Sequence, residues 1–300
     1  MNHWGLFTNS FGKMLHPVLW VYSLLITVAT SNLGAFFLFN EQTIRNLSKA
    51  TTLQSIQTTL APIFAILIVL GVVGFVFATF GGAALIHLIN QLEMRERATL
   101  GKGLDAGEKI FQLLVVRVIL ILPNLLVVVL AFAVMWGQLA RIDLTSRTNP
   151  LSGLFGGVCG IIAIAFVVNL LTSALSVGAE RAIVIEKLSI GKALGLSGQL
   201  LATQLGDFIM IGLIFLGLSF LVGIVFACVG QPLLGLMFSG ASPAALTRGG
   251  LLTNPIVVLM TSLGLIGNML ATILGTSVWT LAYRQWRADQ LPAPLADDFA

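Results

Sequence analysis

The chain has 300 residues, of which 57% are hydrophobic and only 9% are charged, with a formal net charge of +4. Soluble globular domains carry about 25% charged residues, and a soluble chain of this composition would expose large apolar patches that aggregate. The composition therefore excludes an ordinary soluble domain and predicts an integral membrane protein that contacts a lipid bilayer. A nucleic-acid partner is also excluded, because the basic residues are scattered rather than clustered on one face.

The chain begins with an arm over residues 1–16, in which Phe7, Phe11 and Leu15 recur at the spacing of one helical face. We expect this arm to lie flat in the membrane interface. An apolar segment follows the arm, and five more such segments reach the roughly 20 residues that a helix needs to cross a bilayer core. The predicted spans are residues 18–39, 62–90, 111–138, 153–179, 207–229 and 254–282.

These segments predict an all-α fold class. We expect a polytopic membrane helix bundle with six transmembrane helices, arranged as repeated hairpins with cytoplasmic amphipathic elbow helices between them. A single membrane domain is predicted over residues 1–287, and its hairpin units cover about residues 1–90, 91–180 and 181–287. The acidic, proline-bearing tail over residues 288–300 is predicted to be disordered.

Two polar stretches between the spans, residues 96–104 and 186–194, are identical at four of nine positions. They read Glu-Arg-Ala-Thr-Leu-Gly-Lys-Gly-Leu and Glu-Lys-Leu-Ser-Ile-Gly-Lys-Ala-Leu, and Thr99 and Ser189 stand where a helix N-cap belongs. We interpret each stretch as an elbow helix that opens a unit of one elbow and two spans. Two such units indicate parallel repeats about an axis along the membrane normal. A looser match at residues 10–15 adds the interpretation of three equivalent hairpins.

Apolar residues at helical spacing predict that both elbow helices lie on the cytoplasmic surface with one face toward the membrane. These faces are Leu100, Leu104, Phe111 and Val115 in the first copy, and Ile190, Leu194, Leu201 and Leu205 in the second. Of the Lys and Arg residues outside the spans, ten lie in the arm, elbows and tail and five in the opposite loops. Because positive residues stay in the cytoplasm, both termini are predicted to be cytoplasmic.

The arm enters the first span as His-Pro-Val-Leu-Trp at residues 16–20, and the last span closes as Tyr-Arg-x-x-Arg at residues 283–287. With the elbow pattern Glu-Arg/Lys-x-Thr/Ser-x-Gly-Lys-x-Leu, these features resemble a group of six-span bacterial proteins. The group includes the membrane domain attached to some glycerophosphoryl diester phosphodiesterases. The resemblance implies the fold and a bacterial inner (plasma) membrane location. It does not imply the activity, because the acidic and His residues of that hydrolase are missing from this chain.

Arg117 and Asp207 hold equivalent positions in the two repeats, at the start of the third and fifth spans. An ionisable residue inside a membrane is a functional hypothesis by default, and pseudo-symmetry would bring these two together as an intramembrane ion pair. A simpler interpretation stays open. Asp207 would then favour the positive end of a helix dipole, and Arg117 would extend its guanidinium to the headgroups.

Four further polar residues lie in the spans. Asn124, Asn169 and Asn268 are predicted to hydrogen-bond across helices, which such groups do at a gain of about 0.6 kcal/mol each. A role as substrate contacts is the alternative. His87 lies near the inner end of the second span, and we expect it to bond to a neighbouring residue. Glycines at small-residue spacing predict close helix contacts. On the second span they are Gly71, Gly74, Gly81 and Gly82, and on the fourth they include Gly153, Gly156, Gly157 and Gly160.

The sequence combines no nucleophile with a base and no set of metal ligands, so we predict no catalytic, cofactor or metal site and no enzymatic activity. The favoured function is a non-enzymatic scaffold or accessory membrane domain that docks a membrane or cytoplasmic protein or a lipid. The alternative is a transporter or lipid-handling protein that uses the interface between hairpin repeats, because internal repeats are common in transporters.

Overall fold

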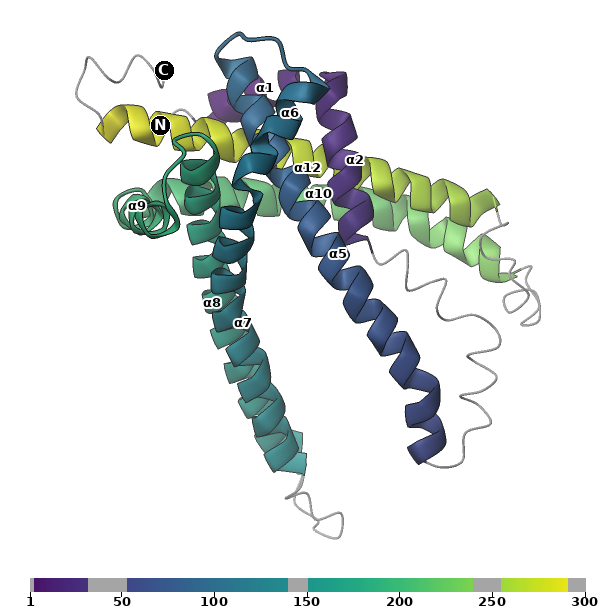
Figure 1. The fold of residues 1–300 in the computed structure, drawn as a ribbon. Coiled ribbons are helices and arrows are strands. Elements are labelled where there is room, and N and C mark those ends of the chain that lie inside the picture. The colour runs from purple at the N-terminus through teal and green to yellow at the C-terminus, as the bar shows by residue number, and fades with distance from the viewer. Residues whose placement is uncertain (1–2, 32–52, 140–150, 240–254, 291–300) are drawn as a thin grey trace. The chain divides into compact units, whose positions relative to one another are not determined.

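The computed structural model describes residues 3–31, 53–139, 151–239 and 255–290. This part of the chain is helical and contains no strand, so the predicted all-α class is confirmed (Figure 1). The helices are α1 (His3–Lys13), α2 (Pro17–Thr30), α5 (Leu53–Glu93), α6 (Leu100–Asp105), α7 (Ile110–Leu139), α8 (Leu151–Val184), α9 (Ile190–Thr203), α10 (Leu205–Ser239) and α12 (Pro255–Gln290). A short 3-10 helix, η1 (Ala106–Lys109), joins α6 to α7.

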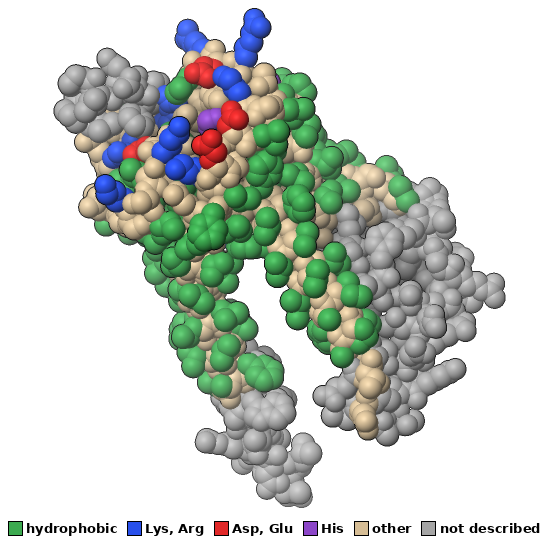
Figure 2. Space-filling view, in the orientation of Figure 1, with side chains coloured by type: hydrophobic (Ala, Val, Ile, Leu, Met, Phe, Trp, Pro, Cys, Tyr) green, Lys and Arg blue, Asp and Glu red, His purple; other side chains and the backbone are tan. Residues whose placement is uncertain are grey.

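Several helices match a bilayer in length and composition. In the described residues, four helical stretches are long and apolar enough to cross a membrane, and the count reaches six if each of two bent pairs is one span. The four stretches are Leu60–Glu93, Leu100–Val134, Gly160–Val184 and Thr261–Gln290. Many large apolar side chains on these stretches are exposed, and Figure 2 shows them along α5 and the α7–α8 pair, which suits contact with lipid. These features are those of a membrane-embedded protein.

The chain divides into two compact units. The first consists of Met1–Gly107 and Ile209–Ala300, and the second is Glu108–Phe208.

Glycines on α5 set the contact between α2 and α5 in the first unit. A Cβ at Gly74 would lie 2.4 Å from the carbonyl oxygen of Ala29, and one at Gly81 would lie 2.7 Å from Cγ1 of Ile26. Because only glycine leaves this space, the two helix backbones approach closely. The predicted contact is therefore present at these positions, whereas a Cβ at Gly71 would meet no atom within 4 Å.

A core of buried side chains lies beside this contact. It joins α2 and α5 to α12 through Leu19, Tyr22, Ala84, Leu85, Leu88, Ile89, Ala98 and Ile273. The hydroxyl of Tyr22 donates a 2.7 Å hydrogen bond to the carbonyl oxygen of Leu100, at the start of α6. Gly103 faces the same ring, since a Cβ there would lie 2.5 Å from it. Tyr22 thus ties α6 to the α2–α5 pair that precedes it.

The N-terminal helix α1 packs against α12. Leu6, Phe7 and Ser10 are buried, and the ring of Phe7 lies 5.3 Å from that of Phe215 on α10. The predicted apolar face is therefore divided: Phe7 lies inside the unit, while Phe11 and Leu15 are 50% and 86% exposed. Helix α1 makes an angle of 95° with α2.

In the second unit, α7 and α8 lie side by side and α9 packs on α8 (Figure 1). The Ser197 hydroxyl donates a 2.7 Å hydrogen bond to the carbonyl oxygen of Leu175. A Cβ at Gly178 would lie 2.4 Å from that hydroxyl oxygen, so glycine permits the approach of α9. On α8, Gly160 has no atom within 4 Å of a Cβ position, and the side chains at residues 151–159 lie outside the described part.

The two elbows share a local pattern. A long helix ends, one residue takes a left-handed backbone conformation (Arg95 at φ 58° or Lys187 at φ 55°), and an N-cap residue opens the next helix. At the predicted caps, the Thr99 hydroxyl accepts a bond from the Lys102 backbone N–H, whereas Ser189 makes no such side-chain bond. The first elbow helix is followed by η1 and then by α7, whereas α9 ends at Thr203 and α10 begins at Leu205.

Helix α9 packs within the second unit through a face other than the leucine face predicted to contact the membrane. Its fully buried residues are Ala193, Ser197 and Leu200, and Leu194 is only partly buried. The small residues pack because α8 offers Gly178 opposite them, which the apolar spacing of α9 alone does not reveal. In the first elbow, Leu100 and Leu104 are 48% and 61% exposed.

Candidate functional site

A polar seam runs between α7 and α8 in the second unit. Arg117 Nε donates a 2.7 Å hydrogen bond to Oε1 of Glu180, and the two side chains form an ion pair with exposed fractions of 23% and 11%. The hydroxyl of Ser176 donates a 3.0 Å bond to the same carboxylate oxygen. The carboxylate is therefore held by two partners inside the helix pair.

The helical spacing explains why these side chains meet. On α7 the buried positions are Leu113, Val116, Leu120 and Val127. Arg117 and Asn124 follow Leu113 and Leu120 by four residues each, so both lie beside this buried stripe. On α8, Thr172 and Ala174 are buried, and residues 178–184 are buried without interruption, so Glu180 lies where the whole circumference of the helix is covered.

Two helical turns away from the ion pair, Asn124 Nδ2 donates a 2.9 Å hydrogen bond to the Thr172 hydroxyl oxygen. That hydroxyl donates to the carbonyl oxygen of Val168 at 2.9 Å. The predicted role of Asn124 in bonding across helices is thus seen in the structure. Asn169 and Asn268 have exposed side chains instead, and their backbone carbonyl groups accept bonds from Thr172 and Thr272.

The predicted pair of Arg117 with Asp207 stays a prediction. The structure gives Arg117 a carboxylate partner in Glu180, which lies one residue beyond the fourth predicted span. Helix α8 continues to Val184, so Glu180 lies inside the helix. Asp207 lies in the first turn of α10, where a negative charge favours the helix dipole.

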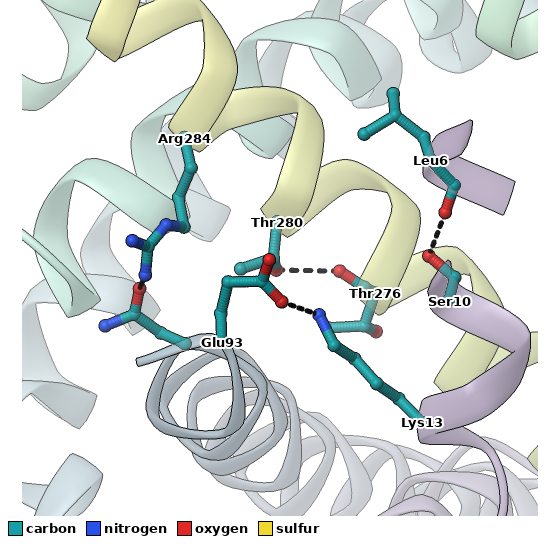
Figure 3. Close-up of polar contacts among 8 residues, drawn as sticks. Leu6, Ser10, Lys13, Glu93, Thr276, Thr280 and Arg284 are labelled. Atoms are coloured by element: carbon teal, nitrogen blue, oxygen red, sulfur yellow. Dashed lines mark hydrogen bonds and ion pairs between the residues drawn. The ribbon is translucent and has the colours of Figure 1, made fainter. Parts of the chain in front are cut away.

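A second polar cluster joins α1, α5 and α12 in the first unit (Figure 3). Lys13 Nζ and the Glu93 carboxylate form an ion pair, with side-chain exposures of 13% and 27%. Arg284 Nη1 donates a 2.9 Å hydrogen bond to Oδ1 of Asn90, one turn earlier on α5. The end of α5 is thereby attached both to the N-terminal helix and to the last helix.

The remaining predicted polar residue, His87, lies on α5 one turn before Gln91. Their Nε2 atoms are 2.9 Å apart, so the histidine bonds to a neighbour as expected. At the exposed elbow beyond α5, Lys102 Nζ donates a 2.8 Å bond to Glu96, and this bond holds the pKa of the Glu96 carboxyl below its usual range. The described residues contain no group of three or more His, Cys, Asp or Glu side chains that could hold a metal ion.

In comparisons with known proteins, no family model, curated protein or solved structure matches the chain.

Proposed function

We propose that the chain is a non-enzymatic membrane domain that docks a partner protein at the side of its elbows. The observation that carries the proposal is that the polar side chains between the helices bond to one another. The pairs Arg117–Glu180, Asn124–Thr172 and Arg284–Asn90 each join two helices, so these groups have a structural role. At Gly74, Gly81 and Gly178 the neighbouring helix lies so close that no side chain would fit at these positions. Such helix contacts fit a rigid scaffold.

The finer architecture belongs to the same proposal. The six spans form hairpins, both termini lie in the cytoplasm, and the membrane is the bacterial inner membrane. The similar elbows support this arrangement, since each follows a long apolar helix and packs back on it: α6 contacts α5, and α9 contacts α8. Equal orientation of the two elbows would place their charged residues on one side of the membrane.

The outer face of α9 is a surface that suits a helix of the partner. It lies opposite the packed residues Ala193, Ser197 and Leu200 and consists of small residues only. Its members are Gly191, Gly195, Gly198 and Ala202. A Cβ at any of the three glycines would meet no atom within 4 Å. Each glycine in a helix costs about 1 kcal/mol relative to alanine, and small residues permit close approach of a second helix.

Photo-crosslinking in native membranes tests the proposal. A photoreactive residue at Lys192 on α9 should give a discrete protein adduct. The same residue at Val72, which is 58% exposed on the α5 shaft, should give lipid adducts only. Gly195→Leu should remove the protein adduct, because the new side chain fills the approach surface. Gly212→Leu on α10, where a Cβ also meets open space, should leave the adduct unchanged.

The proposal fails if Lys192 gives no discrete protein adduct, or if Gly195→Leu leaves the adduct intact while the protein stays folded in detergent. The transporter or lipid-handling alternative, proposed from the internal repeats, is favoured by the charged groups of Arg117 and Glu180 within a helix pair. The test is solute flux or lipid exchange in vesicles that contain the purified chain. Transport that is abolished by Arg117→Lys, in a variant that stays folded, would favour the alternative.

A further inference from the structure

The backbone at the end of α5 places an arginine where glycine is favoured. The Glu96 N–H bonds to the carbonyl oxygen of Gln91 at 2.9 Å, and the Arg95 N–H bonds to that of Leu92 at 3.2 Å. These two bonds are those of a Schellman motif, whose left-handed residue is usually glycine because a Cβ is strained there. Arg95 occupies this position at φ 58°. An arginine here therefore carries backbone strain that a glycine would avoid.

Charge pairing around the elbow leaves two guanidinium groups available. Glu93 is paired with Lys13, and Glu96 is paired with Lys102. Arg95 and Arg97 are exposed, and the structure shows no carboxylate partner for either among the described residues. The acidic residues nearest to these arginines in the chain are thus neutralised by lysines.

The depth of the two arginines follows from the apolar surfaces on either side. The candidate span of α5 ends at Glu93, and the next candidate span begins at Leu100. Leu100 and Leu104 are 48% and 61% exposed, so the lipid-facing surface resumes three residues after Arg97. Ala98, which is 9% exposed and belongs to the core of the first unit, fixes the elbow between these surfaces. Arg95 and Arg97 consequently lie at the level of the lipid headgroups.

We propose that Arg95 and Arg97 form a binding site for the phosphate of an anionic phospholipid at the membrane surface. Guanidinium groups match phosphate oxygens through paired hydrogen bonds, and an anionic surface attracts cations next to a membrane helix. The proposal needs only the membrane embedding of the chain and stands apart from the docking of a protein partner.

The second elbow also places a cation at a left-handed residue, although its backbone bonds differ: the Leu188 N–H bonds to the carbonyl oxygen of Ala182 at 3.2 Å. Lys187 holds the left-handed position at φ 55°, and both Lys187 and Lys192 are exposed. A cation thus occupies the glycine-favoured position in both units. A cation near the C-terminus of a helix is also stabilised by the helix dipole. The experiment must therefore distinguish this local stabilisation from the binding of a phosphate.

Native mass spectrometry of the full chain in detergent, titrated with phosphatidylglycerol, tests the site. The variant Arg95→Gly with Arg97→Gln should bind this lipid about 30-fold more weakly, given the usual contribution of each surface cation. Because glycine suits the left-handed backbone, this variant should remain folded. The variant Arg95→Lys with Arg97→Lys should bind with an affinity between those of the wild type and of this variant, because it keeps both charges but loses the paired hydrogen bonds that a guanidinium makes to phosphate.

A charge-matched control is Arg45→Gln with Lys49→Gln, which lies in the loop predicted on the opposite side and should not change the affinity. The proposal is overturned if the Arg95/Arg97 variant binds phosphatidylglycerol like the wild type, if the control loses as much, or if phosphatidylcholine binds equally well. Competition by millimolar inorganic phosphate would reassign the site to free phosphate and would also overturn it.

Discussion

Arg117 and Glu180 show how a charged residue is accommodated in an apolar helix pair. Each charge is close to one end of its helix, since Arg117 is the eighth residue of α7 and Glu180 lies four residues before the end of α8. At 1.5 Å per residue this places them about 6–10 Å inside. A carboxylate with two bonded partners there avoids the cost of an unpaired charge in a medium of low dielectric constant.

Removing one partner of this pair should destabilise the chain by about 3–5 kcal/mol, because it leaves the other charge buried without compensation. We expect Arg117→Gln and Glu180→Gln each to show this loss, and the double variant to lose much less than their sum. Denaturant unfolding in detergent micelles provides the double-mutant cycle. Asp207→Asn serves as the comparison: additive losses with Arg117→Gln would remove the predicted Arg117–Asp207 pair. Additive losses in the Glu180 cycle would contradict the structure.

At the scale of elements, glycines rather than large apolar residues determine which helices meet. Gly74 and Gly81 are two turns apart on α5, and both face the backbone or side chains of α2. Gly71 lies on the same helix with open space around it. The difference between these positions comes from the partner helix, because the glycine itself is identical in each case.

Gly74→Ala should destabilise the first unit by about 1–3 kcal/mol, because the new methyl group would lie 2.4 Å from the Ala29 carbonyl oxygen and force α2 away. Gly71→Ala should be neutral or stabilise by up to about 1 kcal/mol, because alanine favours the helix and meets no neighbour. Thermal unfolding of both variants in detergent measures the two effects. Equal melting temperatures for the pair would show that α2 and α5 are not in close contact.

The sequence predicts the long helices well because an apolar run of sufficient length has few alternatives in a membrane. Their ends are predicted less well. Helix α8 continues past residue 179 to Val184, because Glu180 finds Arg117 and Ser176 as partners within the helix pair. Helix α5 likewise begins at Leu53, well before the predicted span. Polar residues appear as loop signals until their partners on another helix are known.

Partner geometry also limits the prediction of the elbows and of the candidate site. The Gly-Lys pair of residues 12–13 ends α1, whereas the similar pairs at residues 101–102 and 191–192 open α6 and α9. The three sequence matches therefore occupy different positions in their helices, one at the end and two at the start. Asn124 was identified from its depth in a span, but its partner Thr172 depends on the register of α7 against α8.

Across the whole molecule, each short helix packs on one of the long helices. Helix α6 packs on α5, α9 packs on α8, and the N-terminal helix α1 packs on α12. Each short helix thus packs on a long helix: α6 and α9 pack on the long helix that precedes them, and the N-terminal α1 packs on the last one. The predicted repeat instead grouped each elbow with the spans that come after it, and parallel duplication is compatible with either grouping.

Both groupings require the two elbows to face the same compartment, and cysteine labelling tests this requirement. In a chain whose native Cys159 and Cys228 are replaced by alanine, single cysteines are introduced by Arg97→Cys and Lys187→Cys, both at exposed elbow positions. A membrane-impermeant maleimide should label both in inverted vesicles and neither in right-side-out vesicles, because positive residues are retained in the cytoplasm.

Arg147→Cys, in a loop predicted on the other side, supplies the opposite control and should label only in right-side-out vesicles. Its label shows that the reagent and the vesicle orientation are sound, so a negative result at the elbows can be interpreted. Labelling of residues 97 and 187 from opposite compartments would mean that an odd number of crossings separates the elbows. The helices between them, α7 and α8, could then not both span the bilayer with α6 and α9 on one side, and the parallel duplication would be excluded.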